Sequence, residues 1–409
     1  MRTTYPCRAV LSLLGFFIAF ATSAEEHKGP WTRHTIDNSS RGADGVRLGD
    51  INGDGHMDIV TGWEEGGIVR LYLNPGPKKS KEKWPAVTVG PAKNVEDAVL
   101  VDLDNDGTMD VVSSCEGKTK TMFVHWGPKD KTKLLDEDAW VTEPIPATVG
   151  KQQWMYCLPK GTRKSDGAVV LHVGSKGKDA AIGSLISGDD PRDLDKWTYF
   201  RFSDAGWIMS IQHYRNEAFD YEFVLVTDRR GPTRGIYRIG DHDLKPDGIQ
   251  QNAAEYMFAH AVPHPEDDLY TLIAVATRDG FIQLFDDREA QRSFGEPVKV
   301  PNPFGIKHGK AVAIGRIDSD LDTDLVVSFN TQGAKNKPGV AWVRVLPDKD
   351  PKDWPANDIS GLKGKKFDRL ELIDLDGDGD LDVLTCEEAD NLGVIWYENP
   401  YGAAKDQKP

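Results

Sequence analysis

Three features of the sequence predict an all-β protein that closes into a ring of similar blades. The chain of 409 residues repeats itself about every 55 residues, and a regular period of this length is typical of a repeat architecture. Each repeat contains short runs of Val, Ile, Leu and aromatic residues, broken by Gly, Asp and Pro, which is a pattern of β-strands. No stretch shows the periodicity of an amphipathic helix of three turns or more. These features predict a seven-bladed β-propeller of four-stranded antiparallel blades.

A tryptophan at the start of a short extended run marks most of the repeats. The marks are Trp31, Trp84, Trp140, Trp197 and Trp354, and Phe294 takes the same place in one further repeat. The strand-rich units begin near Gly45, Asp97, Trp154, Trp207, Met257, Lys310 and Asp368. The run WTRHTID precedes the first unit, so we expect it to supply the outer strand of the last blade and close the ring.

The two ends of the chain are predicted to lie outside the propeller, which should span residues 25–400. Residues 1–24 contain two arginines, a mostly apolar run over 9–21 and then small residues. This pattern predicts a signal peptide. The run is too short to cross a bilayer, so we expect an exported protein, periplasmic or extracellular. Residues 401–409 are predicted to be a flexible tail.

Removal of the signal peptide would change the formal charge of the chain from −15 to −17. This negative charge disfavours nucleic acid and anionic membranes as partners.

Three repeats carry an acidic loop between their first two strands. In the last repeat, Asp374, Asp376, Asp378 and Asp382 are spaced two to four residues apart, and Gly379 follows the third. Oxygen ligands at this spacing suit Ca²⁺, and carboxylates brought together without a cation would repel one another. We therefore expect structural Ca²⁺ here, the alternative being Asp-Gly turns without metal. The other two loops contain Asp50, Asn52, Asp54 and Asp58, and Asp102, Asp104, Asp106 and Asp110.

A fourth acidic loop is a degenerate copy. Arg316 stands where the first ligand is expected, and the loop continues with Asp318, Asp320, Asp322 and Asp324. Whether this loop binds Ca²⁺ stays open at this point. The three repeats between residues 154 and 309 have no such loop and should bind no metal there.

The loops GDINGDGHMD, VDLDNDGTMD and IDLDGDGDLD resemble those of FG-GAP or VCBS repeats. Such repeats form the blades of the integrin α-subunit head, of several secreted polysaccharide lyases and of fungal aldos-2-ulose dehydratase. The resemblance covers nearly the whole mature chain. It implies a propeller that binds calcium, but no single function, because such scaffolds carry many.

We expect a functional site at one mouth of the axial channel, where the first residues of the innermost strands meet. Aligning the repeats by their loops places aromatic rings and charged groups there, a combination that suits a sugar or uronate. The candidate catalytic residues are His308, His260, Tyr156, Lys310, Arg47 and Arg369, and the candidate ligand-binding residues are Asp97, Trp154, Trp207 and Asp368. The alternative is that these side chains form only ion pairs and packing contacts between blades.

The leading functional hypothesis is a secreted, calcium-stabilised propeller that binds a carbohydrate or other small polar ligand at this mouth. The alternative is a carbohydrate-active enzyme, a polysaccharide lyase or sugar dehydratase, with acid–base residues in the same place. A protein-adhesion module is the third hypothesis. The sequence contains no nucleophile elbow, zinc motif, phosphate loop or dinucleotide fingerprint, so the enzyme hypothesis depends on the mouth residues and the resemblance.

Overall fold

The computed structural model describes residues 29–402, except for 163–166, 217–220, 232, 241–245, 252–253, 266, 287–295 and 321. The predicted signal peptide, Phe294 and most of the predicted tail lie outside the described residues. The described part of the chain contains β-strands and short 3₁₀ helices but no α-helix, which confirms the all-β prediction. None of its helical segments is long and apolar enough to cross a lipid bilayer.

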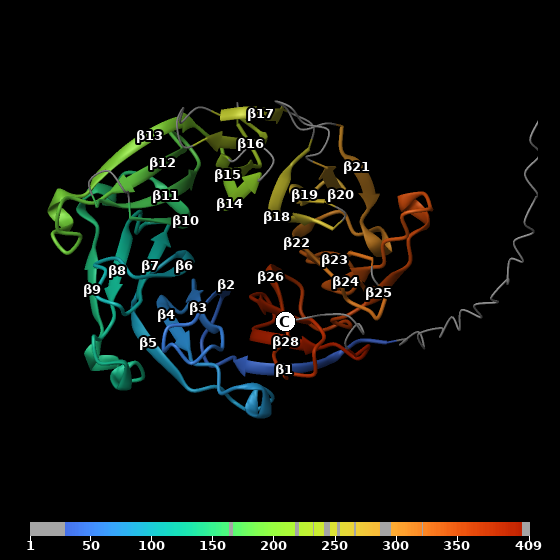
Figure 1. Cartoon of the computed structure of the whole chain (residues 1–409), viewed down its shortest axis with the longest axis horizontal. Helices are drawn as coiled ribbons and strands as arrows, with labels where there is room; N and C mark the ends of the chain where they lie inside the picture. Colours follow the sequence, from blue (N-terminus) through green and yellow to red (C-terminus); the bar gives the residue numbers. More distant parts are fainter. Residues whose placement is uncertain are drawn as a thin grey trace, which may run out of the picture.

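Seven four-stranded antiparallel sheets surround a central axis (Figure 1). The strands of blades 1 to 4 are β2 (Ala43–Gly49), β3 (Asp58–Trp63), β4 (Ile68–Tyr72), β5 (Ala86–Pro91), β6 (Val95–Val101), β7 (Asp110–Cys115), β8 (Met122–Trp126), β9 (Val141–Pro144), β10 (Gln153–Thr162), β11 (Val169–Lys176), β12 (Ala181–Ile186), β13 (Thr198–Asp204), β14 (Ile208–Asn216), β15 (Tyr221–Asp228), β16 (Gly235–Gly240) and β17 (Pro246–Gln251). The strands of blades 5 to 7 are β18 (Tyr256–His264), β19 (Asp267–Thr277), β20 (Phe281–Asp286), β21 (Val298–Pro301), β22 (Gly309–Gly315), β23 (Asp324–Phe329), β24 (Val340–Val343), β25 (Ala356–Asp358), β26 (Phe367–Ile373), β27 (Asp382–Glu387), β28 (Gly393–Glu398) and β1 (Thr32–Asp37). The 3₁₀ helices are η1 (Pro77–Lys79), η2 (Lys131–Lys133), η3 (Glu137–Ala139), η4 (Pro146–Thr148), η5 (Leu194–Lys196), η8 (Pro303–Gly305) and η9 (Pro351–Asp353). The predicted number of blades is confirmed.

The ring closes between the two ends of the chain. Strand β1 pairs with β28 as the outer strand of blade 7 (Figure 1), as WTRHTID was expected to do. His34 on β1 stacks on Trp396 of β28 at 4.4 Å between ring centroids. Its Nε2 lies 2.8 Å from a carboxylate oxygen of Glu398. Side-chain contacts therefore reinforce the backbone pairing that closes the propeller.

The tryptophans that mark the repeats stand directly before the outer strands. Trp84, Trp140 and Trp197 are buried, and each indole N–H donates to a backbone carbonyl of the preceding connection at 2.9–3.0 Å. A buried indole N–H needs such a partner. The tryptophan thereby attaches the connection between the third and outer strands to the body of the blade, which gives the sequence period its structural reason.

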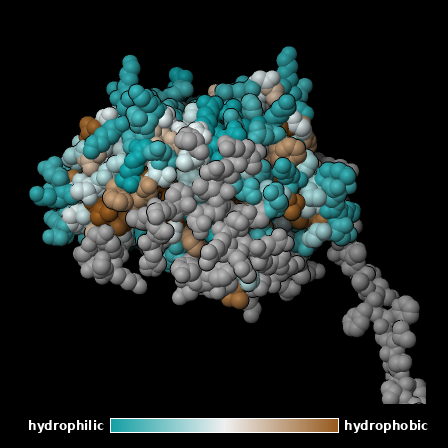
Figure 2. Space-filling view, turned by 90° about the horizontal axis from the view of Figure 1, so that it is seen from above, coloured by the Kyte–Doolittle hydropathy of each residue, from teal (hydrophilic) through white to brown (hydrophobic). Residues whose placement is uncertain are grey.

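Hydrophobic side chains fill the space between neighbouring blades. One buried cluster joins blades 7 and 1 and contains Trp63, Tyr72 and Trp396, and similar clusters join the other blades. In the side view of Figure 2 the described surface is largely hydrophilic, with apolar residues in small separate patches. Small scattered patches are ordinary for a folded protein surface.

Every inner strand contains a β-bulge near its first residues. In all seven blades, the register between the inner strand and the second strand shifts at this point. A bulge inserts a residue and changes the direction of the side chains around it. The shifts lie between Asp44 and Arg47, Val95 and Asp97, Trp154 and Tyr156, Ile208 and Ser210, Tyr256 and Ala259, Gly309 and Val312, and Phe367 and Leu370. The positions of the bulges therefore determine which side chains of the inner strands face the axis.

Candidate functional site

A cavity of about 270 Å³ is lined by residues of all seven blades, at the end of the blades where the inner strands begin. We call this cavity the axial pocket. Its lining residues are Asp44, Glu64, Glu96, Glu116, Met155, Tyr156, Lys176, Trp207, Met209, Arg229, Met257, Arg278, His308, Gly309, Lys310, Asn330, Lys366 and Asp368. Since the acidic loops follow the opposite ends of the inner strands, the pocket and the loops lie at different ends of the blades.

One position of every blade contributes to the site and was not predicted from the sequence. It is the last residue of the second strand or the residue directly after it. The seven equivalents are Glu64, Glu116, Lys176, Arg229, Arg278, Asn330 and Glu388. Six of them line the pocket, and Glu388 lies beside Asp44 and Asp368. A periodic signal for this position exists in the sequence, because a charged or amide residue stands at the end of the second strand of each repeat. The predicted mouth residues came only from the first strands.

The charges of the pocket are divided between two sides. The carboxylates come from blades 7, 1 and 2, and most of the basic groups come from blades 3 to 6. The acidic side contains Asp44, Glu64, Glu96, Glu116 and Asp368, and the basic side contains Lys176, Arg229, Arg278, His308 and Lys310. Lys366 of blade 7 stands among the acids. A ligand in the pocket would therefore meet hydrogen-bond acceptors on one side and cations on the other.

Lys176 balances part of the acidic side. Its ammonium lies 2.9 Å from an oxygen of Glu96 and also pairs with Glu116. Burial raises the pKa of Glu96 to about 7, and the neighbouring Glu116 carboxylate adds to the rise. Burial also raises the pKa of Glu64. The acids of blades 1 and 2 thus form a crowded group that depends on one lysine.

Arg229 is a basic group of the pocket that pairs with no described carboxylate. Its side chain is buried, its guanidinium lies 3.7 Å from the ring centroid of Trp207, and its Nε has no hydrogen-bond partner among the described residues. It forms no ion pair with a carboxylate of the described chain. Burial, together with the nearby Arg278 and Arg230, lowers the pKa of Arg229 to about 10. A buried cation without a counter-ion favours an anionic ligand.

The structure brings half of the predicted site residues into the pocket. Tyr156, Trp207, His308, Lys310 and Asp368 line it. Burial strongly raises the pKa of Tyr156, and the acids Glu96 and Asp44 add to the rise. The Tyr156 hydroxyl therefore stays protonated and can donate or accept a hydrogen bond.

The other predicted residues do not line the pocket. Arg47 forms a two-fold ion pair with Asp97, with both N···O distances at 2.8 Å. Asp97 also accepts a hydrogen bond from the backbone N–H of Cys157 at 3.1 Å. Arg47, Asp97 and Cys157 belong to blades 1, 2 and 3, so this group connects three blades.

Trp154, His260 and Arg369 likewise have structural contacts. Trp154 is fully buried and donates its indole N–H to the Thr148 carbonyl. His260 Nδ1 accepts a hydrogen bond from the backbone N–H of Ile314 in the next blade, and burial lowers its pKa. Arg369 pairs with Glu371 on its own strand. The loop alignment could not detect the bulges, and a shift of one residue turns a side chain to the other face. For this reason Glu96, Met155 and Asp368 face the axis, and their neighbours Asp97, Trp154 and Arg369 do not.

The acidic loops of blades 2 and 7 have donor sets that fit Ca²⁺. Three carboxylates approach within 4.8 Å of one another in each loop: Asp102, Asp104 and Asp106 in blade 2, and Asp374, Asp376 and Asp382 in blade 7. The Asp376 Oδ1 and Asp106 Oδ2 atoms are buried and accept no hydrogen bond from the described residues. Clustered carboxylates are what a hard cation requires. A basic side chain already pairs with each group: Arg192 with Asp104 in blade 2, and Lys81 with Asp376 in blade 7. In blade 1, Asp50 accepts hydrogen bonds from the backbone of the loop and Asn52 bonds to Asp54.

The fourth aspartate of each loop has a structural role of its own. Asp58, at the start of β3, accepts hydrogen bonds from the backbone N–H groups of Ile51 and Asn74, and Asp110, Asp324 and Asp382 repeat this pattern in their blades. Burial raises the pKa of Asp58 to about 6. These aspartates attach each loop to the end of the third strand.

In blade 6, an arginine reaches into the degenerate loop. Arg344 Nε lies 3.1 Å from Asp318 Oδ2, and its Nη2 lies 2.7 Å from Asp320 Oδ2. The guanidinium thus stands where a cation would neutralise these two carboxylates. The loop of blade 6 therefore has its own positive charge, as the loop of blade 2 has in Arg192. Unlike the loops of blades 2 and 7, its described aspartates include no group of three within 4.8 Å of one another, which argues against Ca²⁺ at this position.

Comparisons with known proteins agree with this architecture. Residues 50–113 match the family model of an FG-GAP-like repeat. Among solved structures, the chain is similar to BBS1N in two crystal structures of its complex with ARL6DN, one soaked with mercury and one with lead. In each, the TM-score is 0.53 at 11% identity, over 92% of this chain and 99% of that chain, so the likeness concerns the fold alone. The curated proteins include no significant match.

Proposed function

We propose that this β-propeller with FG-GAP-like repeats is an exported, calcium-stabilised protein that binds a carbohydrate carrying a carboxylate, such as a uronate, in its axial pocket. The observation that carries the proposal is the buried Arg229 guanidinium, which lines the pocket without a carboxylate partner among the described residues. Arginine binds carboxylates through charge-assisted hydrogen bonds. The signal-like sequence of residues 1–24 supports export.

The two sides of the pocket suit the two kinds of group on a uronate. The sugar hydroxyls would donate hydrogen bonds to the carboxylates of blades 7, 1 and 2, and the uronate carboxylate would meet Arg229, Arg278 and Lys310 on the other side. Trp207 is less suited to stack on a sugar ring, because Arg229 and Lys176 lie over it at 3.7 and 4.7 Å. Recognition would therefore depend on charge and hydrogen bonds.

We expect Arg229→Met to weaken the binding of a uronate oligosaccharide by about 10- to 100-fold, because a hydrogen bond to a charged group contributes about 1.5–3 kcal/mol. Isothermal titration calorimetry with uronate oligomers and matched neutral oligomers measures this loss. The control is Arg230→Met: Arg230 is the next residue in the chain but is exposed and does not line the pocket. Equal binding of neutral and acidic oligomers, or equal loss in both variants, would contradict the carboxylate assignment.

The enzyme hypothesis is tested with the same ligands. A lyase or dehydratase produces an unsaturated product. Of the predicted acid–base residues, His308 and Tyr156 line the pocket, and so does Lys310, which is predicted to neutralise a carboxylate or enolate. We expect binding without a new ultraviolet absorbance. Turnover that His308→Gln abolishes would instead show that the pocket is an active site.

We expect chelation of calcium to lower the melting temperature of the protein, because ions that bind only the folded state stabilise it by mass action. Differential scanning calorimetry with and without a chelator measures the change. The variant Asp374→Asn replaces a predicted ligand of the blade 7 loop and should reduce the change in melting temperature that calcium causes. An unchanged melting temperature after chelation would remove calcium from the proposal.

A further inference from the structure

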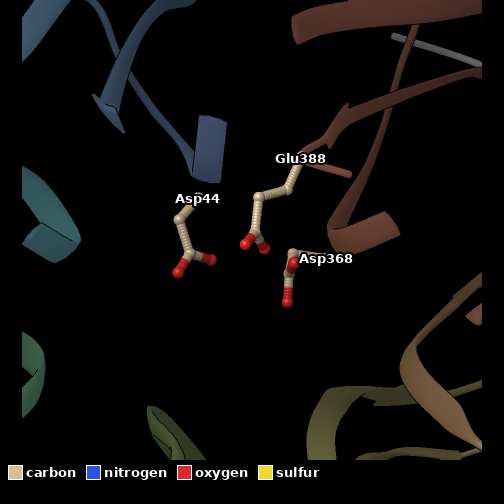
Figure 3. A group of neighbouring side chains, drawn as sticks. All are labelled: Asp44, Asp368 and Glu388. Atoms are coloured by element: carbon tan, nitrogen blue, oxygen red, sulfur yellow. The ribbon is translucent and has the colours of Figure 1, made fainter. Parts of the chain in front are cut away.

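We propose that Asp44, Asp368 and Glu388 form a binding site for one divalent cation in the axial pocket, separate from the acidic loops. One oxygen of each carboxylate lies within 4.8 Å of the other two, and the three side chains point toward a common space (Figure 3). Asp44 lies near the start of β2 in blade 1, Asp368 lies in β26, and Glu388 follows β27 in blade 7.

Two of these carboxylates belong to buried residues and have at least one oxygen without a partner among the described residues. Asp368 is 2% exposed; it pairs with Lys310 through Oδ1, and its buried Oδ2 has no hydrogen-bond partner among the described residues. Asp44 is 7% exposed, and its carboxylate forms no ion pair or hydrogen bond with a described residue. Leaving buried polar atoms unpaired costs free energy. A cation between the two aspartates would satisfy both.

The carboxylates of the cluster outnumber the ammonium groups that pair with them. Lys310 pairs with Asp368 and Lys366 pairs with Glu388, so two ammonium groups face three carboxylates. Neither lysine pairs with a second member of the cluster in the described chain.

The second acidic cluster of the pocket differs in this respect. Glu64, Glu96 and Glu116 also have oxygens within 4.8 Å of one another, but Lys176 pairs with two of them. One lysine ammonium thus stands where a metal ion would stand. In the Asp44 cluster, no described ammonium group forms ion pairs with two of the carboxylates; Lys366 pairs with Glu388 and attracts Asp368 and Asp44 from a greater distance.

The donor set predicts the type of ion and its effect. Three carboxylates provide only oxygen ligands, which suit Ca²⁺, Mg²⁺ or Mn²⁺ rather than Zn²⁺. Asp50 lies six residues along the chain from Asp44, at most about 20 Å at 3.3 Å per residue, and the intervening strand β2 runs away from the pocket, so the ion would be distinct from the one expected in the blade 1 loop. It would join blade 7 to blade 1, which are the blades between which the ring closes.

The test counts bound ions. Metal-free protein is dialysed to equilibrium against Ca²⁺ alone, and the bound calcium per chain is measured by atomic emission. We expect the double variant Asp44→Asn with Asp368→Asn to bind one ion fewer than the unmodified chain. The matched control, Glu64→Gln with Glu116→Gln, should bind the same number, and Asp374→Asn should lose one loop ion and so show that the assay detects a single loss.

An unchanged count in the double variant would overturn the proposal and would mean that the cluster shares a proton instead. Circular dichroism establishes that each variant is folded. If the double variant does not fold, the single variant Glu388→Gln replaces it, because Glu388 is only partly buried. It should weaken the affinity for one ion about tenfold, and unchanged affinity for every ion would again contradict the site.

Discussion

Replacing Asp97 with alanine is expected to lower the free energy of unfolding by about 3–5 kcal/mol, the cost of removing one partner from a buried ion pair. The side chains of Arg47 and Asp97 are 12% and 3% exposed. Without Asp97, the Arg47 guanidinium would stay buried without its partner, and the Cys157 N–H would lose its acceptor. Urea denaturation followed by tryptophan fluorescence measures the loss.

The matched control for Asp97→Ala is Glu371→Gln. The ion pair of Arg369 with Glu371 has similar chemistry, but its side chains are 23% and 22% exposed. Partly exposed pairs contribute only about 0–1 kcal/mol. Similar losses in both variants would show that the Arg47–Asp97 pair does not connect the blades in the way that the structure indicates.

Lys176→Met is expected to cause a loss of similar size, about 3–5 kcal/mol near pH 8, because it leaves Glu64, Glu96 and Glu116 close together without their lysine. Methionine keeps most of the apolar stem of the side chain, so the loss reports chiefly on the charge. The same denaturation experiment measures it.

The effect of Lys176→Met should depend on pH. The pKa of Glu96 is raised from 4.5 to about 7 in the folded protein, so between these values the folded state binds more protons than the unfolded state. Stability therefore increases as the pH falls through this window. Removing Lys176 raises the pKa of the glutamates further, so the variant should recover stability as the pH falls from about 8 to about 5. A loss that is independent of pH would mean that Lys176 acts through packing and not through its charge.

The repeat pattern predicted the architecture because it depends on interactions that are local in the chain. The tryptophan period reflects an indole hydrogen bond to a carbonyl a few residues upstream, as in Trp84 with Ser80. The closing role of WTRHTID followed from its position before the first repeat. Both features are visible without knowledge of the contacts between blades.

The pocket was harder to predict because it depends on backbone geometry. A bulge leaves no clear mark in the sequence: Glu96 and Asp97 are adjacent acids, yet one faces the axis and the other pairs with Arg47 of the neighbouring blade. The role of Arg344 in the degenerate loop was equally hidden, because it lies 24 residues from Asp320. Contacts of this kind appear only when neighbouring strands and blades are in place.

The pairing of β1 with β28 has a consequence for the order of events during synthesis. His34 and Glu398, which meet across this pair, are separated by 364 residues. At a synthesis rate of about 5–20 residues per second, β1 waits on the order of 20–70 s for its partner. Throughout that interval the first strand has an open edge, and blade 7 cannot be completed. The finished ring is therefore a product of the whole chain, and a chaperone would encounter an open arc of blades before then.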